Sequence, residues 1–164
     1  MNVTNTAFAR IDQIAPFIHI SSSVLFIAVQ LSVVIFSRYF FKDIEQNTHR
    51  YKTILKEFRR FMISELCLIS VICISGIFLL SRDEFKISDP MIEAIVATKW
   101  ALMLFILSNI AYMWHKFNLA KNAFLNDEVI GTHENLVLII YYFTPLNIVL
   151  SFISIYLGIT FRGI

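Results

Sequence analysis

The sequence predicts an all-α integral membrane protein: one domain, residues 1–164, forming an up-down-up-down bundle of four transmembrane helices. Of its 164 residues, 57% are hydrophobic and 16% are charged, and the mean hydropathy is +0.69, which is unusual for a soluble domain. Charges are sparse in four runs, each about as long as the roughly 20 residues that span a bilayer. These runs are Ile14–Ser37, Phe61–Leu80, Met91–Trp114 and Asn135–Thr160. Because backbone polar groups in lipid must pair within their own segment, we expect all four to be helices.

The first run, Ile14–Ser37, follows a polar start and is too long for the apolar core of a cleavable signal peptide. It carries a polar stripe, because five of its side chains fall in one narrow sector at 100° per residue. They are His19, Ser22, Ser23, Gln30 and Ser37. Lipid cannot satisfy such groups, so we expect the stripe to face the interior of the bundle.

The connections between the runs predict the orientation in the membrane. Residues 41–60 and 115–134 together hold eight Lys and Arg residues, whereas the opposite side holds four, namely Arg10, Arg82, Lys86 and Arg162. Positive charge marks the cytoplasmic side, so we expect both termini to be external (periplasmic) in a bacterial inner membrane. The first connection lacks glycine and proline, and we expect it to continue as helix beyond the membrane.

The second run, Phe61–Leu80, contains Cys67 and Cys73. Six residues is not a same-face spacing on a helix, so we interpret them as reduced, buried packing thiols. Glu65 lies a few residues into this run. We favour its pairing with Arg59 or Arg60 near the interface over a role in a proton path.

The third run, Met91–Trp114, contains Lys99, although a charge at the centre of a membrane helix costs about 2.5–3.5 kcal/mol on insertion scales. Three explanations stay open: snorkelling of the ammonium group toward the headgroups, pairing with a carboxylate, or binding of an anionic or electron-rich ligand inside the bundle. Small side chains form the opposite face of this helix. They are Ala94, Ala97, Ala101, Ser108 and Ala111.

His19 and Lys99 are the main candidates for a functional site in this sequence. In the predicted orientation their depths differ by only about 5 Å, at 1.5 Å of rise per residue. His19 could simply bond to a neighbouring helix or could ligate iron, since imidazole is a common axial ligand of haem. Met103, one turn from Lys99, could be a thioether ligand, although a packing role is the simpler interpretation. His49, His115 and His133 lie in or beside the connections and suit boundary positions.

The fourth run, Asn135–Thr160, has a second stripe of small and weakly polar residues spaced three and four apart. They are Thr144, Asn147, Ser151, Ser154 and Gly158. This spacing is typical of close helix packing, with a solute or cofactor pathway as the alternative. The chain has no glycine-rich phosphate loop and no motif of a soluble hydrolase or zinc enzyme.

The arrangement resembles the HemJ-type protoporphyrinogen IX oxidases and the related copper-resistance D-like membrane proteins. The resemblance rests on four segments: "FIHISSSVLFIAVQL", "EFRRFMISELCLISVICISGIFLL", "MIEAIVATKWALMLFILSNIAYMWHK" and "TPLNIVLSFISIYLG". It implies that a b-type haem is bound, that His19 ligates its iron, and that Lys99 sits at the haem or substrate site. We add Met103 and the arginine pair Arg59–Arg60 to the candidate cofactor-binding residues.

Three functions follow as hypotheses. The first is a haem b-binding redox protein in which electrons pass between a membrane-soluble carrier, such as a quinone, and a haem or porphyrin near the external side. Whether it is an enzyme stays open; the reaction implied is porphyrinogen oxidation. The second is a copper or small-solute transport component. The third is a non-catalytic accessory subunit of a larger membrane complex. We expect a homo-oligomer or such a complex in the bilayer, and no nucleic-acid partner.

Overall fold

In a computed structural model the chain is a bundle of long helices, described for residues 5–41, 49–81 and 90–160. The elements are α1 (Asn5–Phe41), α2 (His49–Leu80), α3 (Pro90–Leu125), α4 (Val129–Leu138), the π-helical segment η2 (Ile139–Phe143) and α5 (Thr144–Thr160). Four segments of this described part are long and apolar enough to cross a membrane: α1, α2, α3 and a fourth span that α4, η2 and α5 form together. This confirms the predicted all-α four-helix membrane bundle. Lys42, Arg82, Lys86 and Arg162, which contribute to the predicted orientation, lie outside the described residues, as do the side chains of Arg10 and His49.

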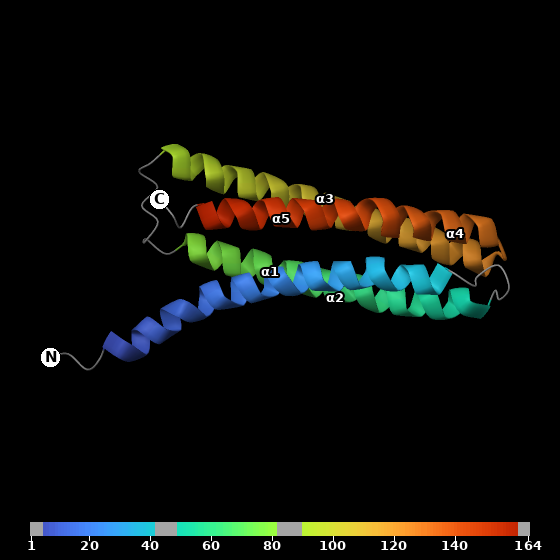
Figure 1. The fold of residues 1–164 in the computed structure, drawn as a ribbon, viewed down its shortest axis with the longest axis horizontal. Helices are drawn as coiled ribbons and strands as arrows, with labels where there is room; N and C mark the ends of the chain where they lie inside the picture. The colour runs from blue at the N-terminus through green and yellow to red at the C-terminus, as the bar shows by residue number, and fades with distance from the viewer. Residues whose placement is uncertain (1–4, 42–48, 82–89, 161–164) are drawn as a thin grey trace.

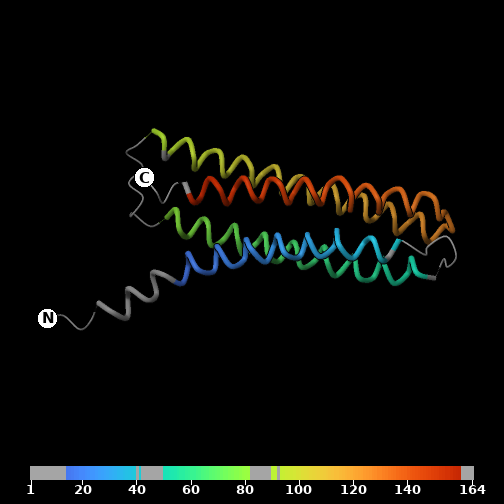
Figure 2. Tube along the Cα trace, viewed as in Figure 1, coloured from blue at the N-terminus to red at the C-terminus, as the bar shows by residue number. Residues whose placement is uncertain are grey.

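The helices run up, down, up and down (Figure 1). We call the end where α1 begins and α5 ends the terminal end, and the opposite end, where α1 connects to α2 and α3 to α4, the connection end. Figure 2 shows α1 alongside α2, and α3 alongside the fourth span, over most of their length. The first residues of α1 and the last residues of α5 therefore lie at the same end of the bundle (Figure 1), as an up-down-up-down arrangement requires.

The link between α3 and α4 differs from the prediction of a loop over residues 115–134. Helix α3 continues to Leu125 and α4 begins at Val129, so only three residues separate them. Asp127 has a left-handed backbone with φ 59°, and the N–H of Glu128 donates to the carbonyl oxygen of Ala123 over 2.9 Å, which are features of a Schellman helix end. A hydropathy reading misses this extension because polar helix residues beyond the membrane look like loop.

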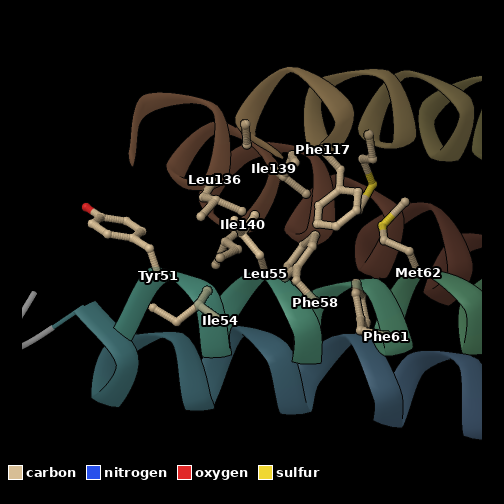
Figure 3. Close-up of a cluster of buried hydrophobic side chains, with 12 residues drawn as sticks. Tyr51, Ile54, Leu55, Phe58, Phe61, Met62, Phe117, Leu136, Ile139 and Ile140 are labelled. Atoms are coloured by element: carbon tan, nitrogen blue, oxygen red, sulfur yellow. The ribbon is translucent and has the colours of Figure 1, made fainter. Parts of the chain in front are cut away.

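The connection end holds the main hydrophobic core. A cluster of large side chains from α2, α3 and the fourth span interlocks there, including Phe58, Met62, Phe117, Leu136 and Ile139 (Figure 3). A smaller cluster at mid-bundle is formed by Phe26, Ile69, Ile72, Ile106 and Ile110. These apolar contacts fix the relative positions of the helices through close packing.

The terminal end is packed less tightly. Among the described side chains, none is fully buried before Ser22 in α1, after Ser75 in α2, before Ile106 in α3 or after Ser151 in α5. The aromatic and aliphatic core therefore lies toward the connection end, and the side chains of the terminal end are less buried.

The fourth span accommodates Pro145 by a local change of helix type. Proline has no N–H to donate and crowds the preceding turn, and the five residues before Thr144 are π-helical. The backbone N–H and the hydroxyl group of Thr144 both donate to the carbonyl oxygen of Ile139, the latter over 3.0 Å. These bonds keep the backbone groups satisfied where an α-helical pattern would fail.

The polar stripe of α1 faces inward, as predicted: Ser22, Gln30 and Ser37 are buried. In the fourth span, Thr144, Asn147 and Ser151 are buried as well. The cysteines correct the sequence interpretation: both are free thiols, but Cys67 is exposed on the bundle surface and Cys73 is half-buried.

Candidate functional site

His19 is held in place by a serine of the neighbouring helix. Its Nδ1 lies 2.9 Å from the Ser75 hydroxyl oxygen, and that hydroxyl group donates its proton to the carbonyl oxygen of Val71 over 2.7 Å. The serine oxygen is then an acceptor, so we assign the imidazole proton to Nδ1. The lone pair of the half-buried ring is consequently on Nε2, the nitrogen left for a ligand.

Two glycines lie against the two candidate residues. A Cβ atom on Gly76 of α2 would come within 3.4 Å of His19 Cε1, and a Cβ atom on Gly158 of α5 would come within 3.1 Å of Lys99 Nζ. The absence of a side chain at both positions lets the imidazole and the ammonium group approach the neighbouring helices closely.

Lys99 turns into the bundle. Its ammonium group lies against Gly158 of α5, and it is close enough to His19 for its charge to act on the imidazole. The structure thus brings His19, Ser75, Lys99 and Gly158 together from all four spans, and we call this group the terminal layer.

The other candidate ligands separate into two positions. Met103 is partly buried and packs against the mid-bundle cluster, one turn from Lys99. Arg59 and Arg60 are exposed on the connection half of α2, where Arg60 bonds to Glu57 over 2.8 Å. They are at least fifteen residues from Ser75 on the same helix, or about 22 Å along its axis. The structure therefore does not bring the arginine pair to the site of His19.

A second polar layer lies closer to the connection end. Asn109 Nδ2 donates to Asn147 Oδ1 over 2.8 Å, and Asn147 Nδ2 donates to the sulfur of Met113 over 3.4 Å. Gln30 and Glu65 are fully buried between α1 and α2. These residues are ten or eleven positions from the terminal layer on each span, so the layers are about 15 Å apart. We call Gln30, Glu65, Asn109 and Asn147 the connection layer.

Glu65 corrects the expected pairing with Arg59 or Arg60. Both of its carboxyl oxygens, like both polar side-chain atoms of Gln30, lack a hydrogen-bond partner within the described parts of the chain. Positions five and six residues apart on one helix point about 120–140° away from each other, so Glu65 faces inward while the arginines face outward. Asn109 was not recognised in the sequence; its signal is that it is a strongly polar residue in the apolar part of the third run.

The remaining described histidines are at the connection end. His115 is exposed. His133 lies 3.2 Å from the hydroxyl oxygen of Tyr51 through Nδ1, and its ring meets Phe41 edge-on. His133 is therefore a packed boundary residue. No group of three or more His, Cys, Asp or Glu side chains that could hold a metal ion is found in the described segments.

Comparison of the chain with protein-family models, curated proteins and solved structures finds no match. The chain is a multi-pass membrane protein by the length and composition of its four spans.

Proposed function

We propose that the protein binds a b-type haem in the terminal layer and takes part in electron transfer in a bacterial inner membrane. The observation that supports this best is the hydrogen bond between His19 and Ser75. An imidazole whose Nδ1–H is bound by a protein acceptor has its ring orientation fixed and presents Nε2 as the ligand. This is the usual arrangement of a histidine prepared to hold a metal.

The types of residue around His19 are suited to binding a haem. The imidazole is half-buried, in the part of the bundle where fewer side chains are buried. Lys99 supplies a positive charge beside it, suited to a propionate group or to the second ligand position. A bound haem would supply the one-electron chemistry, while the protein supplies orientation and a low dielectric.

The position of the terminal layer in the membrane suggests which molecules it would meet. Because the distribution of Lys and Arg predicts external termini, the terminal layer would lie near the external side, within reach of a membrane-soluble quinone or a porphyrin. The exposed small-residue face of α3, from Ala94 to Ala111, offers a surface for a homo-oligomer. A porphyrinogen oxidase activity is the enzyme function we infer from the family resemblance.

The test is a visible spectrum of detergent-purified protein from haem-replete cells, oxidised and then reduced with dithionite. We expect an α-band in the reduced wild type, its loss in His19→Ala, and a weakened or shifted band in Lys99→Ala. His115→Ala is the matched control, because it removes an exposed imidazole at the opposite end and should leave the band intact. A colourless wild type, or an unchanged band in His19→Ala, would refute the proposal.

A further inference from the structure

Glu65 and Gln30 form an unusual pair within the connection layer. Each is fully buried, and the amide group of Gln30 is near enough to interact with the Glu65 carboxyl group. Yet no polar atom of either side chain has a hydrogen-bond partner among the described residues. Buried polar groups are normally paired, so an exception of this kind calls for an explanation.

The charged groups around the pair do not neutralise a carboxylate. From α3 and α5 the same layer presents Asn109 and Asn147, which are uncharged and bonded to each other. On α2 itself, the arginine closest to Glu65 in sequence is Arg60, and its guanidinium group is bonded to Glu57. An isolated carboxylate in an apolar interior is strongly disfavoured, and such a group takes up a proton instead.

A groove leads from this region toward the charged part of α2. It has a volume of about 490 Å³ and follows the seam between α1 and α2. Gln30 and Glu65 are not among its lining residues, but Val29 and Ser64, their immediate neighbours in sequence, line it. Glu57 and Arg60 also line it, so the groove joins the surroundings of the buried pair to the interfacial part of the helix.

We propose that Glu65, positioned by Gln30, is a proton-binding site inside the membrane, and that its proton exchanges with water along the α1–α2 groove. In the resting protein Glu65 is a neutral carboxylic acid. On release, the O–H bond breaks, the proton passes to water in the groove, and the carboxylate is held by the amide N–H of Gln30 until the proton returns. Ionisable groups inside membrane proteins commonly serve such roles. The proposal does not depend on haem binding.

Infrared spectroscopy of the purified protein in lipid tests this directly. A neutral carboxylic acid has a carbonyl stretching band separate from that of carboxylates, and it moves when the proton is replaced by deuterium. We expect such a band in the wild type at neutral pH, its absence in Glu65→Gln, and its shift after transfer into deuterated water. Glu134→Gln, which changes an exposed carboxylate at the connection end outside the groove, should leave the band unchanged.

The route is tested by a matched pair of substitutions. Ser64 and Ser70 are both on α2, and each hydroxyl group donates to the carbonyl four residues earlier. Ser64 lines the groove, whereas Ser70 is exposed and is not among its lining residues. We expect Ser64→Phe to slow the deuterium shift of the Glu65 band several-fold and Ser70→Phe to leave its rate unchanged.

Each outcome of the infrared and exchange experiments either supports or overturns the proposal. A band that is lost in Glu65→Gln and shifts in deuterated water supports the proton site, and slowing by Ser64→Phe alone supports the groove. No acid band means that Glu65 is ionised and compensated by a bound cation, which overturns the proposal. A band that never shifts means a static buried acid and also overturns it. Equal exchange rates in the two serine variants overturn the proposed route.

Discussion

The hydrogen bond between Asn109 and Asn147 makes the sharpest stability prediction of this structure. It joins α3 to α5 with an N–O distance of 2.8 Å, and both side chains are buried. We consider the substitutions Asn109→Leu and Asn147→Leu, singly and together. Each single change removes one partner and leaves one polar atom buried without this bond, Oδ1 of Asn147 or Nδ2 of Asn109, whereas the double change leaves two apolar side chains in their place.

The magnitude follows from the environment of the bond. A buried group that loses its partner costs about 1–3 kcal/mol, but inter-helical bonds in a membrane protein average only about 0.6 kcal/mol, with about 1.7 as the upper end, because separated helices find other partners. We therefore expect each single variant to lose about 1–2 kcal/mol. The double variant should lose less than the sum of the two by about 0.6–1.7 kcal/mol. Asn147→Leu should be the more costly single change, since it also frees the contact to Met113.

Reversible unfolding in mixed detergent micelles measures the four free energies of this double-mutant cycle. The control cycle combines Asn109→Leu with Cys67→Ala, because Cys67 is exposed on another helix and distant sites should be additive within about 0.5 kcal/mol. If the asparagine cycle were additive within that same error, the two amide groups would not be coupled. The geometry of the connection layer would then be wrong.

Three shorter predictions concern the terminal layer and the orientation. Ser75→Ala removes the acceptor for the Nδ1–H group of His19, and we expect haem affinity, measured by titration of the apo-protein, to fall about 10–100-fold; unchanged affinity would mean that the hydrogen bond is not part of the site. Gly158→Leu fills the space 3.1 Å from Lys99 Nζ, so its reduced spectrum should match that of Lys99→Ala while its elution from a sizing column stays normal; a wild-type spectrum would contradict the proposed role of the lysine. Asn126→Cys, in a variant without the native cysteines, places a thiol between α3 and α4, where an impermeant maleimide should label it in broken cells but not in intact cells; labelling in intact cells would reverse the predicted orientation.

Hydropathy and helical periodicity predict the parts of this fold that lipid itself dictates. The four spans follow from the cost of charges in hydrocarbon, and the inward direction of Gln30 and Asn147 follows from their place in polar stripes at 100° per residue. The same reasoning places His19 and Lys99 at similar depth, because depth depends only on the rise per residue. These expectations need no knowledge of which helices are neighbours.

The features that sequence did not predict depend on particular neighbours. Glu65 looked like an interfacial partner of the adjacent arginines, yet the packing of α2 against α1 turns it inward to Gln30. Cys67 looked like a packing residue, yet the same rotation of α2 exposes it. Hydropathy does not predict the end of α3 at Leu125, because the helix continues beyond the apolar segment. There it packs against α4 through close contacts such as that of Gly131 with Ala123. Helix rotation and helix length outside the membrane are set by tertiary contacts, which one sequence does not display.

A charge in the connection layer should shift the midpoint potential of a haem in the terminal layer, by an amount that their separation of about 15 Å determines. At an effective dielectric constant of about 20, two unit charges at that distance interact by about 1 kcal/mol, or about 45 mV in a one-electron midpoint potential. If Glu65 carries its proton, Glu65→Gln removes no charge, and the potential of a haem at His19 should stay within about 10 mV of the wild type. If Glu65 is an uncompensated carboxylate, the same substitution should raise the potential by about 45 mV, because a nearby negative charge favours the oxidised iron. Redox titration of the two proteins at neutral pH therefore tells whether the buried acid is neutral, and a positive shift of that size would refute the proton site while leaving the haem site standing.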